Sequence, residues 1–532
     1  MYLQLLLLTL VATLASGWVW HPLTWPMIYP LVTGALVGIV LGDPVTGMLA
    51  GVYINLLYLC WVTAGGAMPG NIMFAGVFGT ALTIVVGANP VAAPVFAIPL
   101  TFLGLFVWSL QMTLNSVWVE YVAKFAAKGK DKAVEITAYI LPQIIVFFIQ
   151  LIPAILLLYW AETLKTIFST IPDTIWNIIY VAGEMLPLVG IAMMFNYLFA
   201  LKLTPLFFIG YFAVKLLGFN LQTIALFGLL IAVYIFLNRS DSDLGSHFKV
   251  EVKERSYNKQ LRRSDLIKHW LRGYSQEACY NYKSLQAVGA CAAIIPVLRK
   301  LYHDDKDSFT DALNRYLAFF NTEPGFIGPC IAGVAASLEE DRANGILPME
   351  TDINLIRSGS MGPLAGLGDS ISSATIYPVL ISVSIAISLD GNIIGPFVFM
   401  LIFGALMLYI GYKTYMLGYN YSKAAVPTIL KSTFVKMVID QVKPLSFLVL
   451  GALSAEVLSF RISCDAISGF LIFGQKVNFA LIVSTILPIA AVLLVLYIIR
   501  KMIPVYLVIS GIIIIAILGA QLGLLNPGFK YL

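Results

Sequence analysis

The stretch Gly34-Ala-Leu-Val-Gly-Ile-Val-Leu-Gly-Asp-Pro-Val-Thr-Gly47 indicates what kind of fold this chain adopts. An Asp43–Pro44 pair breaks an apolar run, and the glycines recur at the small-xxx-small spacing that lets membrane helices approach closely. Interrupted helices in membranes frequently frame a ligand site near the midplane. The alternative is that Asp43 caps the next helix in an interfacial turn, because Asp is a favoured N-cap residue. Both interpretations predict closely packed membrane helices with a break at Asp43.

The composition agrees with a membrane protein built from many such helices. Of the 532 residues, 59% are hydrophobic and 11% are charged, against about 25% charged in an ordinary soluble domain. At about 20 apolar residues per crossing, the apolar runs can hold on the order of a dozen spans. This composition excludes a secreted domain, a nucleic-acid binder and a fibrous chain. It predicts an all-α polytopic membrane protein with broken helices and re-entrant loops.

Two membrane units flank one polar segment. Residues 1–238 carry few charges between their apolar runs and form the first unit. Residues 239–269 are polar and basic, so the positive-inside rule predicts a cytoplasmic linker. Residues 270–532 form the second unit, in which cytoplasmic or interfacial helices precede further membrane helices. Its apolar runs cover residues 361–389, 393–417, 445–458, 479–499 and 505–525.

Several polar residues of the second unit favour structural roles. Residues 307–320 have the pattern of an amphipathic helix, with Ser308 and Asp311 at capping-box spacing. The run Glu339-Glu340-Asp341-Arg342 is interpreted as a solvated helix end, or as a docking site for a soluble partner. His247 and His269 are predicted to be solvated linker residues. The chain's four histidines form no cluster in sequence, so we expect no phosphohistidine on this chain.

The five cysteines are widely scattered and include no C-x-x-C pair, which argues against a disulfide framework and against a metal site. The glycines around Gly366 and Gly368 have no preceding strand and no Gly-Lys-Ser/Thr pattern, so they do not predict a nucleotide loop. No cofactor is therefore expected.

Three polar segments in apolar surroundings are candidates for ligand binding. Residues 63–71 form a Gly-rich loop too polar for a lipid-facing span, following Asn55; a structural turn is the alternative interpretation. Residues 319–325 place Glu323 just before a proline, where it could instead pair with a basic residue. Asp369 lies in a Gly-rich apolar segment, where burial in a bilayer would cost on the order of 2.5–3.5 kcal/mol. That cost requires a partner, an interfacial location or a function, and capping of a broken helix is the structural alternative.

These segments resemble two subunits of one family. Residues 30–47 and the Gly65-Gly66 loop resemble the membrane C subunit (IIC) of the mannose/fructose/sorbose family of the bacterial phosphoenolpyruvate-dependent phosphotransferase system. The second half is similar to the D subunit (IID). The motifs that carry this resemblance are Tyr282-Lys-Ser-Leu-Gln-Ala-Val-Gly289, Ile295-Pro-Val-Leu-Arg-Lys-Leu-Tyr302, Phe319-Phe-Asn-Thr-Glu-Pro324, Leu338-Glu-Glu-Asp-Arg-Ala-Asn-Gly345 and Met361-Gly-Pro-Leu-Ala-Gly-Leu-Gly-Asp369. Because the two subunits are usually separate chains, this chain resembles a fusion of them.

The resemblance implies a permease that binds a hexose or amino sugar and carries it across the bacterial cytoplasmic (inner) membrane with coupled phosphorylation. The phosphoryl donor would be a phosphohistidine on a cytoplasmic IIB or IIAB subunit, so whether the chain is itself an enzyme stays open. The permease would be a homotrimer of C–D pairs. The implied substrate-binding residues are Asn55, Asn71, Asn321, Thr322, Glu323 and Asp369. Relatives similar to the mannose members have Glu and Asp where this chain has Asn55 and Asn71, so the resemblance leaves the identity of the sugar open. The loop of residues 64–71 is more similar to that of members that handle amino sugars.

The implied reaction is attack of a sugar hydroxyl, expected at C6, on the phosphohistidine. Such a transfer depends mainly on positioning and charge stabilisation, with a carboxylate to accept the hydroxyl proton. Glu323 and Asp369 are the candidates for this catalytic role. Two other classes of function stay open, an ion-coupled secondary sugar transporter and a non-transporting sensor or receptor of the same fold.

Overall fold

The computed structural model describes residues 1–59, 70–198, 201–221, 223–224, 227, 258–348, 350–422, 433–458, 461–462, 470–472, 475–477 and 479–526. In these residues, four helical segments are long and apolar enough to cross a membrane: Pro90–Ala126, Asp131–Tyr159, Asp173–Asn196 and Ile394–Tyr421. A fifth candidate is the pair Tyr2–Gly17 and His21–Ile28, which is bent by 117°. Eight shorter apolar helices accompany them. The prediction of an all-α polytopic membrane fold with broken helices is confirmed.

The first half is a series of helices in which α3 and α4 pack most closely. Its elements are α1 (Tyr2–Gly17), α2 (His21–Thr24), η1 (Pro26–Ile28), α3 (Pro30–Leu41), α4 (Pro44–Leu57), α5 (Ile72–Val86), η3 (Pro90–Ala92), α6 (Ala93–Ala126), α7 (Asp131–Tyr139), α8 (Leu141–Tyr159), α9 (Ala161–Ser169), α10 (Asp173–Met185), α11 (Pro187–Leu198), η4 (Leu201–Leu203) and α12 (Thr204–Lys215). A Cβ on Gly34 would lie 2.6 Å from the Gly47 carbonyl oxygen, so the predicted close approach requires glycine. Asp43 caps α4 and accepts the Thr46 N–H at 3.1 Å. The exposed Asp43 is therefore a helix cap.

The second half begins with a short-helix region and continues with long apolar helices. Its helices are α15 (Arg263–Gly273), α16 (Ala287–Leu301), α17 (Lys306–Arg315), α18 (Pro329–Ala343), α19 (Ile353–Ile371), the π-helical turn η5 (Ser372–Ile376), α20 (Tyr377–Leu389), α21 (Ile394–Tyr421), α23 (Thr433–Val457), α24 (Phe479–Arg500) and α25 (Val505–Gln521). Strand β1 (Arg461–Ile462) pairs with β4 (Leu525–Asn526), and β2 (Phe470–Ile472) pairs with β3 (Gln475–Val477). The five predicted apolar runs fall on α19 to α25.

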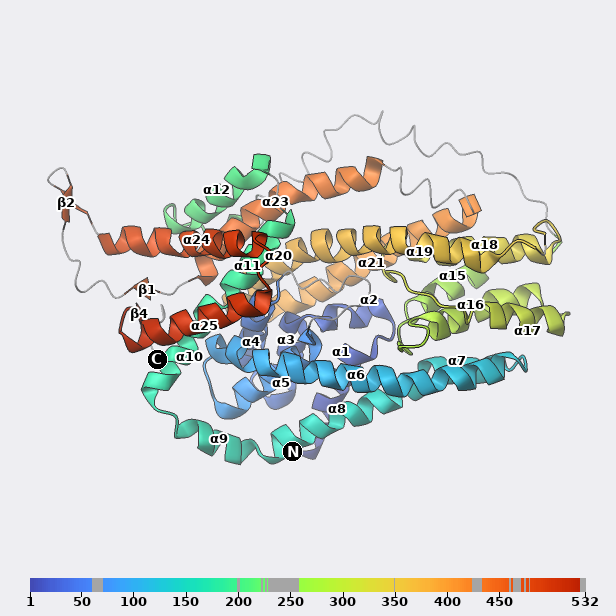
Figure 1. Cartoon of the computed structure of the whole chain (residues 1–532), viewed down its shortest axis with the longest axis horizontal. Coiled ribbons are helices and arrows are strands. Elements are labelled where there is room, and N and C mark those ends of the chain that lie inside the picture. Colours follow the sequence, from blue (N-terminus) through green and yellow to red (C-terminus); the bar gives the residue numbers. More distant parts are fainter. Residues whose placement is uncertain are drawn as a thin grey trace.

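The two halves pack into each other along the molecule. Helices α10, α11 and α12 contact α25, α24 and α23, while α3 and α4 contact α21 and α20. Helices α12 and α23 approach so closely that the contact requires glycine at position 210. A Cβ on Gly210 would lie 2.0 Å from the Leu448 carbonyl oxygen. Figure 1 shows α15, α16 and α17 at one end of the molecule beside α7, and α12, α24 and α25 at the other end. Helices of the first half therefore pack against the second half at both ends of the molecule.

The prediction of a solvated helix end at residues 339–342 is wrong for Glu339 and Glu340, which are completely buried. Glu339 pairs with Arg315 and accepts a hydrogen bond from the Tyr302 hydroxyl at 2.8 Å. Glu340 accepts hydrogen bonds of 2.6 Å from the Leu261 N–H and the Tyr419 hydroxyl. The cause is tertiary, because α18 is packed among α15, α16 and α21. We call Glu339, Glu340, Arg315, Tyr302 and Tyr419 the α18 polar cluster.

Two smaller predictions in this region also need correction. His269 is buried on α15, with Nδ1 3.1 Å from the Tyr415 hydroxyl. Burial, helped by Arg357 and Arg272, lowers the pKa of His269 to about 3. The cap of α17 is Asp305, which accepts the Ser308 N–H at 3.0 Å, and the helix ends at Arg315. His247 lies outside the described residues.

Candidate functional site

A cavity of about 90 Å³ lies where the two halves meet. The first half contributes Trp18, α2, η1 and the start of α5. The second half contributes the segment between α15 and α16, the segment between α17 and α18, and α19 with η5. The polar and aromatic wall consists of Trp18, His21, Trp25, Tyr29, Glu277, Tyr280, Gln286, Asn321, Thr322, Glu323, Asp369 and Ser373. We call this space the central cavity.

Asn321 and Thr322 lie on the cavity wall in the segment before α18. The Tyr280 hydroxyl donates to Asn321 Oδ1 at 3.1 Å. The backbone of Thr322 is held by the Gln286 side chain, which accepts its N–H at 2.9 Å and donates to its carbonyl at 2.7 Å. Thr322 Oγ1 is buried and has no hydrogen-bond partner among the described residues. A buried hydroxyl without a partner is costly, so this atom is suited to a ligand.

Glu323 is buried next to them, but its carboxylate is turned toward the backbone. Its oxygens accept N–H groups from four residues at 2.6 to 3.4 Å, and those residues are Gly325, Phe326, Ile327 and Gly328. Helix α19 approaches this carboxylate at Gly368, where a Cβ would lie 2.6 Å from Glu323 Oε2. Glu323 therefore stabilises the turn that leads into α18.

Asp369 follows Gly368 on α19 and is half-buried on the cavity wall. The π-helical turn η5 comes three residues later and contributes Ser373 to the same wall. π-helical turns inside helices are frequent at functional sites. Tyr29, which also lines the cavity, stacks on Tyr377 with ring centroids 3.9 Å apart. The Gly-rich segment thus brings a carboxylate to the same cavity as residues 321–323.

Asn55 and Asn71 do not belong to the cavity wall. Asn71 caps α5, because its Oδ1 accepts the Phe74 N–H at 3.0 Å and its Nδ2 donates to the Gly104 carbonyl at 3.0 Å. Asn55 is completely buried on α4 and donates to the Tyr377 hydroxyl at 3.0 Å. The loop at 60–69 lies outside the described residues. Both amides therefore hold elements behind the cavity wall.

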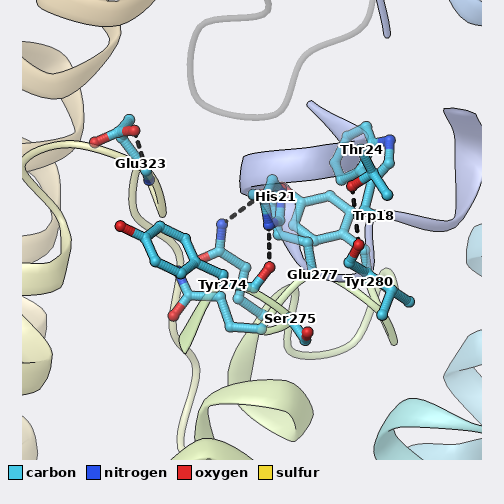
Figure 2. Close-up of polar contacts among 12 residues, drawn as sticks. Trp18, His21, Thr24, Tyr274, Ser275, Glu277, Tyr280 and Glu323 are labelled. Carbon is cyan, nitrogen blue, oxygen red and sulfur yellow. Dashed lines mark hydrogen bonds and ion pairs between the residues drawn. The ribbon is translucent and has the colours of Figure 1, made fainter. Parts of the chain in front are cut away.

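The sequence-based analysis missed another part of the cavity wall (Figure 2). His21 is buried on α2, with Nε2 2.7 Å from Glu277 Oε2 and Nδ1 donating to the Tyr274 carbonyl oxygen. Glu277 Oε1 accepts a hydrogen bond from Gln286 Nε2 at 2.7 Å. Trp18 lies beside this group, and the centroid of its ring is 5.6 Å from the centroid of the Tyr280 ring. The signal available in the sequence was the density of tryptophans around His21.

Comparison with known proteins assigns both halves. The family model for the IID component of the mannose/fructose/sorbose phosphotransferase system matches residues 260–525, and the model for the sorbose-specific IIC component matches residues 2–234. The chain belongs to this phosphotransferase family. The predicted fusion of a C and a D subunit is confirmed, and sugar transport by the phosphotransferase system is the activity of the family.

Individual relatives match one half of the fused permease at a time. The fructose permease IID component of Bacillus subtilis (strain 168) is 32% identical over 275 residues, which is 50% of this chain and 98% of the relative. The mannose-specific EIID component of Escherichia coli (strain K12) is 34% identical over 205 residues, which is 38% of this chain and 71% of the relative. The mannose-specific EIIC component of the same organism is 30% identical over 216 residues, 39% of this chain and 79% of the relative.

A solved structure of the mannose transporter ManYZ in complex with microcin E492 covers 50% of the fused permease and 99% of its own chain, at 30% identity and a TM-score of 0.30. A structure described as a membrane protein covers 50% of the permease and 100% of its own chain, at 29% identity and a TM-score of 0.44.

The wall of the central cavity gives the permease two kinds of contact for a polar ligand. Aromatic rings line one part, and amphipathic rings provide large apolar faces next to polar edges. Amide, hydroxyl and carboxylate groups line the rest, and a few placed polar groups are what fixes a ligand's orientation in a pocket. Among the described residues, no group of three or more His, Cys, Asp or Glu side chains could hold a metal ion.

Proposed function

We propose that this chain binds a hexose or an amino sugar in the central cavity and translocates it across the bacterial inner membrane with coupled phosphorylation. The phosphoryl donor is a phosphohistidine on a cytoplasmic IIB or IIAB subunit. Residues 1–238 act as the C unit, 239–269 as a cytoplasmic linker and 270–532 as the D unit, and the fused chain works as a homotrimer. The observation that carries the proposal is the cavity itself, whose wall is built from both family units.

The chemistry of the wall supports a sugar as the ligand. A pyranose has apolar faces that stack on aromatic rings and a rim of hydroxyls that require donors and acceptors. Tyr29, Trp18 and Trp25 offer the rings, and Asn321 offers an amide that can both donate and accept. The buried Thr322 hydroxyl, which lacks a partner among the described residues, offers one further hydrogen bond.

Phosphoryl transfer breaks the N–P bond of the phosphohistidine, forms an O–P bond to the sugar and releases the hydroxyl proton. Asp369 and Glu323 are the predicted acceptors, and we propose Asp369 for this role. It lies half-buried on the cavity wall, whereas backbone N–H groups occupy both oxygens of Glu323. Glu323 then acts indirectly, by holding the segment that carries Asn321 and Thr322. Asn55 and Asn71 act from behind the wall.

The test is sugar uptake by membrane vesicles that contain the chain. With phosphoenolpyruvate and the soluble phosphocarrier proteins inside, the vesicles should accumulate sugar phosphate, and omission of the IIB protein should abolish accumulation. Accumulation of unmodified sugar driven by a proton gradient alone would overturn the proposal in favour of a secondary transporter. Sugar binding without uptake under either condition would overturn it in favour of a sensor.

A further inference from the structure

We infer that Glu277 is a carboxylate that binds sugar hydroxyls in the central cavity, and that His21 is the positioning residue that fixes it. This inference rests on the proposed function, because it names a new ligand group in the proposed sugar site. Glu277 lies in the segment between α15 and α16 of the D-like half, and His21 lies on α2 of the C-like half. Both line the cavity, and Figure 2 shows their side chains pointing toward each other.

The count of hydrogen bonds separates Glu277 from Glu323. An ionised carboxylate offers about four acceptor sites. Glu323 meets four backbone N–H groups in five contacts, so its acceptor sites are filled. Among the described residues, Glu277 has two partners, His21 Nε2 on Oε2 and Gln286 Nε2 on Oε1, each at 2.7 Å. One acceptor site on each oxygen of Glu277 is left for a ligand, and the side chain is 11% exposed.

The geometry also fixes Glu277 before a ligand arrives. The imidazole of His21 cannot rotate freely, because Nδ1 is tied to the Tyr274 carbonyl while Nε2 faces Glu277. Gln286, the second partner, is held by its two hydrogen bonds to the Thr322 backbone. A group that is already held in its binding orientation loses less conformational entropy when it binds. His21, a residue of the C-like half, thereby fixes the orientation of the Glu277 carboxylate in the D-like half.

Two acceptor sites on neighbouring oxygens fit two neighbouring hydroxyls. We therefore expect Glu277 to bind a vicinal diol of the pyranose ring. A site built to hydrogen-bond a hydroxyl strongly rejects the analogue that lacks it, because the buried acceptor is left without a partner. The proposed site should thus discriminate most strongly among monodeoxy sugars at one pair of adjacent ring positions.

The experiment measures binding to the purified full chain in lipid nanodiscs without a phosphoryl donor. Radiolabelled mannose, fructose and N-acetylglucosamine identify the ligand that binds, and its monodeoxy analogues then compete with it. We expect E277Q to weaken binding of the parent sugar at least about tenfold, while the analogues that lack the contacted hydroxyls bind E277Q and the wild type alike. H21Q should weaken binding less and should affect the same analogues. E162Q, which changes an exposed glutamate on α9, is the matched control.

The outcomes separate binding from folding and from phosphorylation. E277D keeps the charge but moves the carboxylate away from the ligand by one methylene. Its loss of affinity should depend in the same way on which hydroxyl the deoxy analogue lacks, and E277D is the variant to use if E277Q does not fold. Equal weakening of every analogue, or unchanged binding by both variants, would overturn the inference. Because the assay contains no phosphoryl donor, a failed phosphorylation assay leaves the inference standing. A wild-type chain that binds none of the sugars would overturn both proposals.

Discussion

The α18 polar cluster and the central cavity both bury carboxylates, but their hydrogen bonding differs. In the cluster, each oxygen of Glu339 and Glu340 has a partner, and both residues are completely enclosed. Among the described residues of the cavity, Glu277 has two partners for about four acceptor sites, and Thr322 Oγ1 has none. The first region is complete without a ligand, whereas the second leaves hydrogen-bonding capacity open.

This difference separates groups that stabilise the fold from groups that can bind. Removing one partner from a satisfied buried pair leaves an uncompensated charge, so changes in the cluster should reduce stability. Open acceptors and donors contribute to affinity only when a ligand supplies the missing partner. Substitutions in the cavity should therefore alter transport more than unfolding, and the reverse should hold in the cluster.

The largest expected effect is the loss of stability in E339Q. Gln keeps the shape of Glu339 but leaves Arg315, whose side chain is 16% exposed, without a carboxylate. We expect the free energy of unfolding to fall by about 3–5 kcal/mol, measured by thermal or denaturant unfolding in detergent. E350Q, which changes an exposed glutamate, is the control. A melting temperature equal to that of E350Q would contradict the prediction.

The second prediction concerns D369N, which should damage transport with little effect on folding. A residue that accepts a proton in the reaction contributes about 10²–10⁴-fold to the rate, so sugar phosphate formation in vesicles should fall at least about 100-fold. D390N, on the exposed turn after α20, is the control. If uptake by D369N stays near the wild-type rate, Asp369 has a structural role only, and the contrast between the two regions weakens.

The third prediction compares two glycines on α19. G368A places a Cβ 2.6 Å from Glu323 Oε2 and 2.7 Å from its Cβ, so the segment that carries Asn321 and Thr322 must shift. Overpacking of this kind costs about 1–3 kcal/mol, and uptake should fall with it. G366A is a matched control, because a Cβ at Gly366 would have no atom of another described segment within 4 Å. Equal unfolding and uptake in the two variants would show that the approach of α19 to Glu323 is unimportant.

The smallest effect is a pH dependence of stability from His269. Its pKa is about 3 in the folded chain and 6.5 as the ordinary value. Below pH 6.5 the unfolded chain therefore binds a proton that the folded chain does not, and stability falls as the pH decreases toward 3. At pH 5.5 this difference amounts to about 1.4 kcal/mol. H269Q should lose less stability than the wild type between pH 7 and 5.5, whereas H303Q, at an exposed position, should behave like the wild type.

Local features of the chain were enough to predict the helices and part of the site. The apolar runs of residues 361–525 correspond to α19 through α25, and the glycines of residues 34–47 mark the close α3–α4 contact. The segments that carry Asn321 to Glu323 and Asp369 stood out because they put polar groups and carboxylates into apolar surroundings. Hydrophobic length, turn chemistry and the cost of a buried charge are properties of a short stretch of chain, so they can be recognised without the fold.

Only the tertiary structure decided which polar groups are satisfied and which are open. His21 and Glu277 are separated by more than 250 positions, so the local sequence around either residue does not indicate the other as its partner. Glu339, Glu340 and His269 have the local pattern of solvated residues, yet helices from distant parts of the chain bury them. Asn55 and Asn71 lie in the expected segments but their amides are used behind the cavity wall. The partners of a polar group are chosen by long-range packing, which no short stretch of sequence records.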